Sequence, residues 1–185
     1  MLKIIVATAA ILLPGAALAE DWGKFYAEVY GGATLGTDTQ YNGTDYAMDP
    51  TWAAGAAFGV EMGNGFSLGI DLMKTGEAQY QGEPATLSTF SVMAEGEYAL
   101  ALNDTFSVYG SLGLGAINVA IDTGGNDDAW GAGYSAAVGV RANVTENMAL
   151  FGEFKHQDTF ATIDLNGDDL GAPTNTALVG LRLSF

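Results

Sequence analysis

The chain has no cysteine, one histidine, and 6 basic residues against 22 acidic ones. Without cysteine, no disulfide supports the fold in an oxidising compartment. The formal net charge of −16 makes a nucleic-acid partner unfavourable, because phosphates repel such a surface. After residue 20 the longest apolar stretch, 52–60, has nine residues and includes two glycines. A membrane-crossing helix needs roughly 20 apolar residues, so none is expected there.

The N-terminal residues have the features of a secretory signal peptide. Lys3 supplies the positive region, residues 4–13 form the apolar core, and Pro14-Gly15 breaks the helix before a small-x-small site at 17–19. The alternative, a helical anchor, is disfavoured because the apolar core is shorter than the roughly 20 residues needed to span a bilayer. We therefore expect cleavage after Ala19, with residues 1–19 as signal peptide and 20–185 as one domain.

Eight segments of alternating apolar and polar residues follow, and period-two alternation predicts strands with one apolar face. They cover residues 24–36, 52–62, 66–75, 88–101, 106–121, 132–144, 148–160 and 174–185. The chain also holds 26 glycines, about twice the usual ~7%. In a small barrel, glycine makes room for large neighbours and permits strand curvature.

The connections alternate between short and long. Residues 63–65, 102–105 and 145–147 are tight links rich in Asn, Asp and Gly. The other four are longer and polar, at about 37–51, 76–87, 122–131 and 161–173. This rhythm is typical of an up-and-down transmembrane β-barrel with short periplasmic turns and long outer loops. A soluble sandwich or lipocalin-like barrel is the alternative. The signal peptide, the final strand ending on Phe185 and the grouping of charges on one face favour the membrane barrel.

Parity assigns each strand an outward and an inward face. Residues such as Val29, Phe58, Leu112 and Val138 fall on the outward, lipid-facing side. We also expect two aromatic girdles, one near the short turns (Phe66, Tyr98, Phe106, Phe185) and one near the long loops (Tyr46, Trp52, Tyr80, Trp130, Tyr134, Phe160).

Most charged residues of the strands share the opposite parity. They are Glu28, Glu61, Asp71, Glu95, Glu97, Arg141, Glu153, Lys155 and Arg182. A charge facing lipid is costly, so these side chains must point into the barrel. Eight strands enclose a space just wide enough for side chains to fill. We therefore expect a self-satisfying interior network in preference to a narrow ion path, with the excess carboxylates held by water, hydroxyls or a proton.

Two motifs resemble a known family. The run Leu150-Phe151-Gly152-Glu153-Phe154-Lys155-His156-Gln157-Asp158 is similar to the Glu-Tyr-Arg-Tyr-x-Asp seventh-strand pattern of the porin-like outer-membrane β-barrel family, although Phe154 and His156 replace the two tyrosines. The segment 179–185 resembles the family's closing strand. The resemblance implies a fold like that of small eight-stranded barrels, such as the transmembrane domain of outer membrane protein A and small surface antigens. It also implies that Phe185 belongs to the signal read by the barrel-insertion machinery.

Other chemistry finds little support in the sequence. His156 is lipid-facing by parity, but lipid A deacylases carry His-x-Ser, and Asp158 stands where serine would be. No nucleophile and base can be paired. The acidic run 164–169 fails the EF-hand pattern, because Gly167 occupies position four and Asn175 position twelve. We expect no catalytic residue, no cofactor and no defined metal site, although loose divalent binding by acidic loops stays open.

The sequence therefore predicts an all-β, eight-stranded outer-membrane barrel without enzymatic activity. Its expected surroundings are outer-membrane lipids and lipopolysaccharide, and it is expected to be a monomer. The expected role is structural, in envelope integrity and in display of surface loops. An adhesin or receptor-type binding protein and a narrow porin-like channel are the alternatives, and a lipid A-modifying enzyme is disfavoured.

Overall fold

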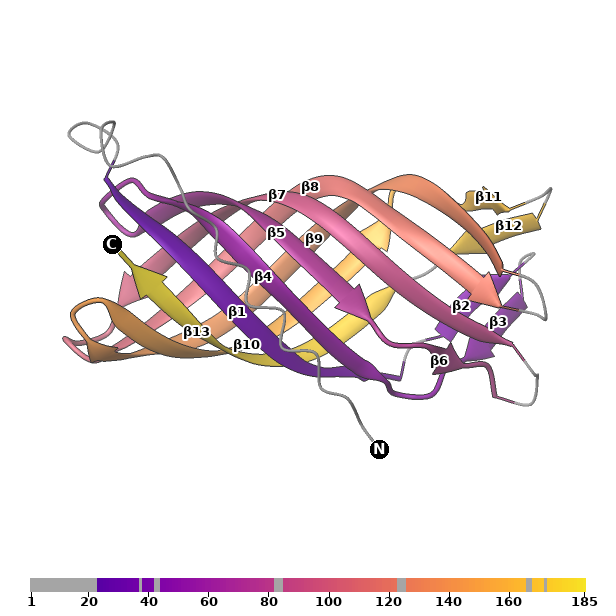
Figure 1. Cartoon of the computed structure of the whole chain (residues 1–185), viewed down its shortest axis with the longest axis horizontal. Coiled ribbons are helices and arrows are strands. Elements are labelled where there is room, and N and C mark those ends of the chain that lie inside the picture. The colour runs from indigo at the N-terminus through magenta and orange to yellow at the C-terminus, as the bar shows by residue number, and fades with distance from the viewer. Residues whose placement is uncertain are drawn as a thin grey trace.

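The protein is a closed antiparallel barrel capped at one end by a small second sheet (Figure 1). This computed structural model describes residues 23–36, 38–41, 44–81, 85–122, 126–165, 168–171 and 173–185. The expected signal peptide and its cleavage site lie outside the described residues. Within those residues, no helix is long and apolar enough to cross a membrane.

Eight long strands form the wall. They are β1 (Lys24–Leu35), β4 (Trp52–Glu61), β5 (Phe66–Thr75), β7 (Thr86–Ala101), β8 (Phe106–Asp122), β9 (Asn126–Thr145), β10 (Met148–Thr159) and β13 (Thr174–Ser184). Each pairs antiparallel with its neighbours, and the ring closes where β1 meets β13 with Glu28 opposite Arg182. The predicted fold class and all eight expected strands are confirmed.

The three tight links, the start of β1 and the end of β13 lie at one end of the barrel, which we call the short-turn end (Figure 1). The link at 63–65 requires glycine or asparagine at each position, because Gly63, Asn64 and Gly65 have φ of 79°, 55° and 80°. Only glycine adopts such angles readily, and asparagine is among the few other residues that tolerate them. At the link at 102–105, the Asn103 Oδ1 accepts hydrogen bonds from the backbone N–H groups of Thr105 and Phe106 at 2.9 and 2.8 Å.

The opposite, loop end differs from the expectation of four long loops. Here β2 (Asp38–Tyr41), β3 (Thr44–Ala47), β11 (Ile163–Leu165) and β12 (Asp168–Gly171) form a four-stranded sheet in the order β11-β12-β2-β3. A further short strand, β6 (Ala78–Gln79), pairs with β7. The sequence signal is present in hindsight. Asn42-Gly43 separates β2 from β3 and Asn166-Gly167 separates β11 from β12, and Asn-Gly favours two-residue hairpin links.

The third long connection, expected at 122–131, is mostly strand. β8 and β9 stay paired up to Asp122 and Asn126. The pattern of β8 explains the error, because its apolar residues change parity partway along. Leu112 and Leu114 point outward and are exposed, whereas Ile117, Val119 and Ile121 point inward and are buried. Beyond this change the barrel wall presents Asn118 outward, hydrogen-bonded to Asp128 at 2.8 Å, as a water-facing wall does.

The expected outward faces are confirmed on every long strand. Large apolar side chains are exposed at Val29, Phe58, Leu68, Leu100, Leu112, Val138, Leu150 and Val179. Girdle residues Phe66, Tyr98, Phe106 and Phe185 are exposed at the short-turn end, and Trp52, Trp130 and Phe160 toward the loop end.

Tyr46 and Tyr80 are not girdle residues, and that expectation was wrong. Tyr80 is buried inside the loop end, and the Tyr46 ring packs edge-on against it with centroids 5.9 Å apart. The reason is that the loops fold back over the barrel opening. Met48 and Tyr80 form a bridge there, so the apolar residues of the loops face inward.

Inside the barrel, aromatic rings lie on glycines. The Tyr26 ring covers Gly59 and Gly69, Tyr109 covers Gly139, and Phe151 covers Gly180. A Cβ atom added at Gly139 would clash with the Tyr109 ring, lying 2.7 Å from its Cε1. Glycine on the inner wall therefore creates the space that the rings fill.

We predict that Gly139→Val destabilises the barrel by about 1–3 kcal/mol, the usual cost of overpacking. The new side chain must displace the Tyr109 ring, whose hydroxyl donates to the Glu153 Oε2 at 3.0 Å. Urea unfolding in detergent measures the effect. Gly110→Val is the matched control, since a Cβ at this outward glycine makes only an ordinary contact of 3.6 Å. Equal midpoints for the two variants would contradict the packing argument.

Candidate functional site

The inward faces of seven strands bring nine charged side chains together in the barrel interior. The structure separates them into two groups of ion pairs. The Lys155 group consists of Lys155, Asp71, Glu95 and Glu153, and the arginine group consists of Arg141, Arg182, Glu28, Glu61 and Glu97. All nine residues that the sequence assigns to the interior belong to one of these groups.

The Lys155 group places one ammonium among three carboxylates. The Lys155 Nζ lies 3.0 Å from Glu95, 3.3 Å from Asp71 and 3.7 Å from Glu153, and only 2% of its side chain is exposed. Each carboxylate also accepts a hydrogen bond from a neutral hydroxyl. Tyr30 donates to Asp71 at 2.6 Å, Ser135 to Glu95 at 2.9 Å and Tyr109 to Glu153 at 3.0 Å. Hydroxyl donors thus stabilise the charges that Lys155 alone leaves in excess.

The arginine group is centred on Arg182. Its guanidinium contacts Glu28 at 2.9 Å, Glu61 at 3.0 Å and Glu97 at 3.2 Å, and its NH2 donates to the Ser67 hydroxyl at 3.1 Å. Arg141 completes the group through Glu97 at 2.8 Å and Glu28 at 3.6 Å. Two arginines sharing two glutamates tie β1, β7, β9 and β13 together across the interior, and these bonds use the fork geometry of the guanidinium.

Each base also has an aromatic partner that the sequence interpretation missed. The guanidinium of Arg182 stacks 3.6 Å from the Tyr26 ring centroid, that of Arg141 lies 4.6 Å from Tyr109, and the Lys155 Nζ lies 5.7 Å from Tyr30. Such cation–π contacts strengthen when they are shielded from water. The available signal was parity, because Tyr26 and Tyr30 occupy inward positions of β1, the strand that carries Glu28, and Tyr109 occupies an inward position of β8.

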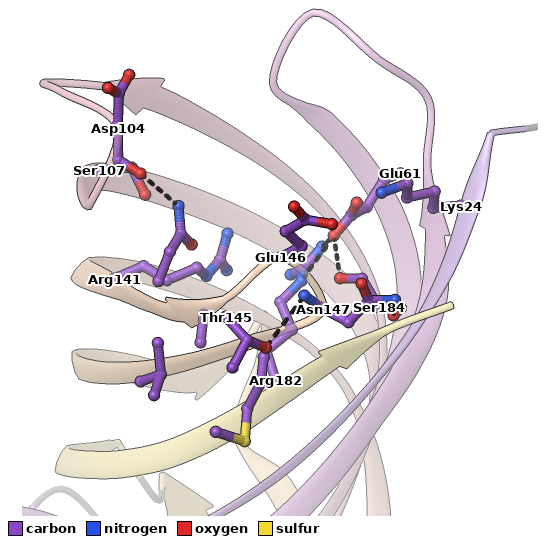
Figure 2. A pocket seen from close by; sticks show the side chains of 14 residues that line it. Lys24, Glu61, Asp104, Ser107, Arg141, Thr145, Glu146, Asn147, Arg182 and Ser184 are labelled. Carbon is purple, nitrogen blue, oxygen red and sulfur yellow. Dashed lines mark hydrogen bonds and ion pairs between the residues drawn. The ribbon is translucent and has the colours of Figure 1, made fainter.

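A vestibule of about 430 Å³ opens the interior at the short-turn end (Figure 2). Its wall includes Lys24, Asp104, Asn143 and Glu146, and its floor is made by Arg141, Arg182 and Glu61. Figure 2 shows Arg182 and Ser184 pointing toward Glu61, whose Oε1 accepts a hydrogen bond from each at 3.0 and 2.9 Å. The vestibule therefore ends on the arginine group.

Beyond the arginine group, two interior cavities lined by described residues are small. A cavity among Glu28, Glu95, Ser111 and Lys155 measures about 10 Å³, and one among Thr34, Thr75 and Thr89 about 20 Å³. Each has room for about one water molecule. Hydrogen-bonded hydroxyl and amide side chains lie between these two cavities, including Ser91 and Gln157 at 3.1 Å.

An apolar cluster closes the loop end from inside. It consists of Met48, Tyr80, Leu87, Met93, Ile117, Val119, Ile121 and Ile163, all buried, and we call it the loop-end cluster. The sequence interpretation missed it because apolar residues were assigned to the lipid side. The parity change along β8 was the signal that could have revealed it.

His156 lies on the outward face, as its parity predicts. Its Nδ1 is 2.8 Å from the Asn175 Oδ1, and its ring centroid is 5.9 Å from that of Tyr134. The described residues contain no group of three His, Cys, Asp or Glu side chains arranged to hold a metal ion. The acidic run 164–169 falls partly outside the described residues, since Asn166 and Gly167 are not described.

Residues 5–185 match the family model of the outer membrane protein β-barrel domain. The match spans nearly the whole chain, so the protein belongs to this family. No curated protein sequence matches the chain.

Several solved structures share the fold. Neisserial surface protein A superposes with a TM-score of 0.67 at 15% identity, covering 87% of this chain and 97% of its own. The outer membrane protein OprG of Pseudomonas aeruginosa gives 0.60 at 13% identity, covering 89% and 97%. Ail, the attachment invasion locus protein of Yersinia pestis, gives 0.53 at 14% identity, covering 89% and 99%. At these identities the likeness shows the fold alone.

Family and fold together define a small Gram-negative outer-membrane β-barrel whose long strands cross the membrane. The expected localisation is confirmed. In barrels of this type the short turns face the periplasm and the long loops face outward.

Proposed function

We propose that the protein is a closed structural barrel that supports the envelope and displays its loop sheet, and that it has neither channel nor enzymatic activity. The observation that carries this proposal is the filled interior. Between the vestibule and the outside stand the arginine group, the Lys155 group and the loop-end cluster, with cavities of about 10 and 20 Å³ among the polar layers. An ion would have to displace Arg182 and Lys155 from their carboxylates and then cross apolar side chains.

Conductance across a planar bilayer tests the closed interior. Purified protein refolded into vesicles and fused with the bilayer is expected to give no discrete current steps in 1 M KCl. Protease resistance of the wall strands in the same vesicles serves as the control for insertion. Regular steps of one size from inserted wild-type protein would overturn the closed barrel and favour the narrow channel.

A surface-binding role is the second candidate, and the ordered loop sheet favours it. The sheet joins β2 and β12 from distant loops, with Leu170 opposite Tyr41, and so provides a defined outer surface. One of the structurally similar proteins, Ail, is named for attachment. A loop replacement distinguishes an adhesin or receptor role of the loops from the envelope role.

Replacing residues 38–47 with a Gly-Ser linker of equal length removes two strands of that sheet and leaves the barrel wall intact. If the role is in the envelope, the replaced protein restores detergent resistance to cells lacking the gene as well as wild type does. Binding of whole cells to host cells or matrix that disappears with the same replacement would favour the adhesin. Abundance in the outer membrane must be equal for both proteins.

We also propose that Phe185 forms part of the signal read during insertion. The backbone N–H of Phe185 donates to the Phe25 carbonyl at 2.8 Å, and the Phe185 carbonyl accepts from the Phe25 N–H at 3.0 Å. Phe185 is 58% exposed, with its ring on the lipid side. The exposed ring contributes little to packing within the barrel, so it is accessible to an assembly partner.

Deleting Phe185 is therefore expected to lower the amount inserted in cells severalfold, while the same purified chain still refolds in detergent. Phe185→Ala keeps the backbone pair and is expected to show the same cellular defect. Leu183→Ala, another outward position on β13, is the matched control. Quantitative blotting of outer-membrane fractions measures the effect. Normal insertion of both Phe185 variants would remove the ring from the signal, and failed refolding of the deletion in detergent would make Phe185 a structural residue.

A further inference from the structure

The vestibule at the short-turn end contains an arginine whose hydrogen-bonding capacity is only partly used. Arg141 contacts Glu97 at 2.8 Å and Glu28 at 3.6 Å, and both contacts use its Nη2. Its Nε is buried and has no hydrogen-bond partner among the described residues, and only 8% of the residue is exposed. Leaving a buried guanidinium donor unpaired is costly, so an acceptor is expected beside Arg141.

Arg182, the other arginine of the vestibule floor, differs in this respect. Its Nε donates to Glu61 at 3.0 Å, its Nη1 to Glu28 at 2.9 Å and its Nη2 to Ser67 at 3.1 Å, so all three nitrogens are used. Arg182 is therefore fully engaged in holding the barrel together. Arg141 lines the same vestibule with donors to spare, and these donors are available to a ligand.

The charges around the vestibule favour a ligand that carries both signs. Its lining includes three bases and three acids, which are Lys24, Arg141, Arg182, Glu61, Asp104 and Glu146. Lys24 is paired in register with Glu61, whereas Asp104 and Glu146 are exposed in the links at 102–105 and 145–147. Neither of these two acids forms an ion pair with a described residue. A carboxylate at the floor would meet Arg141 and an ammonium at the rim would meet the two acids.

The size and the neutral groups of the vestibule suit a short peptide. Its volume of about 430 Å³ lies within the ~300–1,000 Å³ range of small-molecule sites. Ser107, opposite Arg141 in the strand register, contributes a hydroxyl, and Asn143 contributes a side-chain amide. Such groups donate to and accept from peptide amides. Val144 and Met148 add apolar surface for small side chains.

We propose that the vestibule binds a short peptide with free ends, whose carboxylate pairs with Arg141 and whose ammonium lies at Asp104 and Glu146. Short turns face the periplasm in barrels of this type, so the peptide is a periplasmic one. The proposal goes beyond the envelope role and does not depend on a closed interior, because the ligand enters and leaves by the same opening.

Arginine side-chain NMR of the ¹⁵N-labelled barrel in detergent micelles tests the site, with the dipeptide Ala-Ala as the probe. The chain has two arginines, so the spectrum contains two Nε signals. The Arg141 signal is expected to shift saturably with Ala-Ala. The Arg182 signal is the internal control and is expected to shift less than half as far, because its Nε is already bonded to Glu61.

Two blocked dipeptides separate the contributions of the ligand's charges. N-acetyl-Ala-Ala lacks the ammonium, and Ala-Ala-amide lacks the carboxylate. Each is expected to bind at least fivefold more weakly than Ala-Ala, because each leaves one end of the vestibule without its counter-charge.

Substitutions at the rim and the floor test the same assignment from the protein side. Asp104→Asn with Glu146→Gln is expected to weaken Ala-Ala binding at least fivefold and not to weaken binding of N-acetyl-Ala-Ala. Asp127→Asn with Glu77→Gln is the matched control, because it removes the same charges from exposed positions at the loop end, and it is expected to change affinity less than twofold. Arg141→Lys keeps the charge but loses the planar fork, and is expected to weaken Ala-Ala binding at least fivefold.

If Arg141→Lys fails to fold, the wild-type Arg141 signal and the rim variants still decide the question. A wild-type Arg141 signal without a saturable shift would overturn the site. Binding of N-acetyl-Ala-Ala as tight as that of Ala-Ala would indicate the C-terminus of a larger chain as the ligand, and equally tight binding of Ala-Ala-amide would indicate an N-terminus. Either result would overturn the assignment to a free peptide, and equal weakening by the rim and control variants would overturn the role of the two acids.

Discussion

Lys155→Met is expected to lower the free energy of unfolding by about 3–5 kcal/mol, on the scale known for broken buried ion pairs. Lys155 is the one base of its group, and its side chain is almost completely buried. Methionine fills a similar volume but leaves Asp71, Glu95 and Glu153 facing one another without a counter-charge. Their mutual repulsion and desolvation then oppose folding.

Urea unfolding of the refolded variant in detergent, followed by tryptophan fluorescence, measures this loss. Lys74→Met is the matched control, because Lys74 is exposed, and its midpoint is expected to stay within about 0.5 kcal/mol of wild type. Adding Asp71→Asn to Lys155→Met removes one unpaired charge and is expected to restore part of the stability. A midpoint for Lys155→Met equal to that of Lys74→Met would show that the group is hydrated or pairs differently.

Arg182→Leu is expected to cost a similar amount, about 3–5 kcal/mol. Leucine removes the contacts with Glu28, Glu61 and Glu97, the hydrogen bond to Ser67 and the stacking on Tyr26. Arg141 stays in the group but reaches only Glu28 and Glu97, so Glu61 loses its ion pair.

Arg182→Lys separates the charge from the geometry. A lysine keeps the positive charge but cannot contact three carboxylates and a hydroxyl with one planar fork, so an intermediate midpoint is expected. An Arg182→Leu midpoint equal to that of wild type would mean that the vestibule hydrates Glu61 and its neighbours well enough to replace the arginine. The same measurement on Glu61→Gln, which removes one carboxylate at the vestibule floor, is expected to shift the midpoint much less.

Period-two alternation was enough to predict the barrel and the inward position of the nine interior charges, because a charge facing lipid is costly. The alternation did not predict which charged residues form ion pairs with one another. Arg182 on β13 meets Glu28 on the adjacent β1 but also Glu97 on the distant β7. Contacts across the barrel depend on stagger and tilt, which local spacing does not encode.

The outer part of the barrel was predicted less well, and the residues explain why. Alternation was interpreted as if every apolar residue faced lipid. Ile117, Val119 and Ile121 reverse this rule, because the wall there has left the bilayer and encloses its own apolar cluster. The same reversal accounts for Tyr46 and Tyr80, and the Asn-Gly pairs at 42–43 and 166–167 were available as hairpin signals.

The seam between β1 and β13 has a consequence for the order of assembly. The hydrogen bond between Arg182 and Glu28 links residues 154 positions apart, and the pair of Phe25 with Phe185 closes the ring at its far edge. Contacts of such sequence separation raise the contact order and slow the search for the native topology. Glu28, Glu61 and Glu97 all precede Arg182 in the chain, so they lack this counter-ion until β13 docks. Ring closure and the pairing of Arg182 with these glutamates therefore occur in one late event, and a chain halted before it carries an open edge and an arginine group in which Arg141 is the one base.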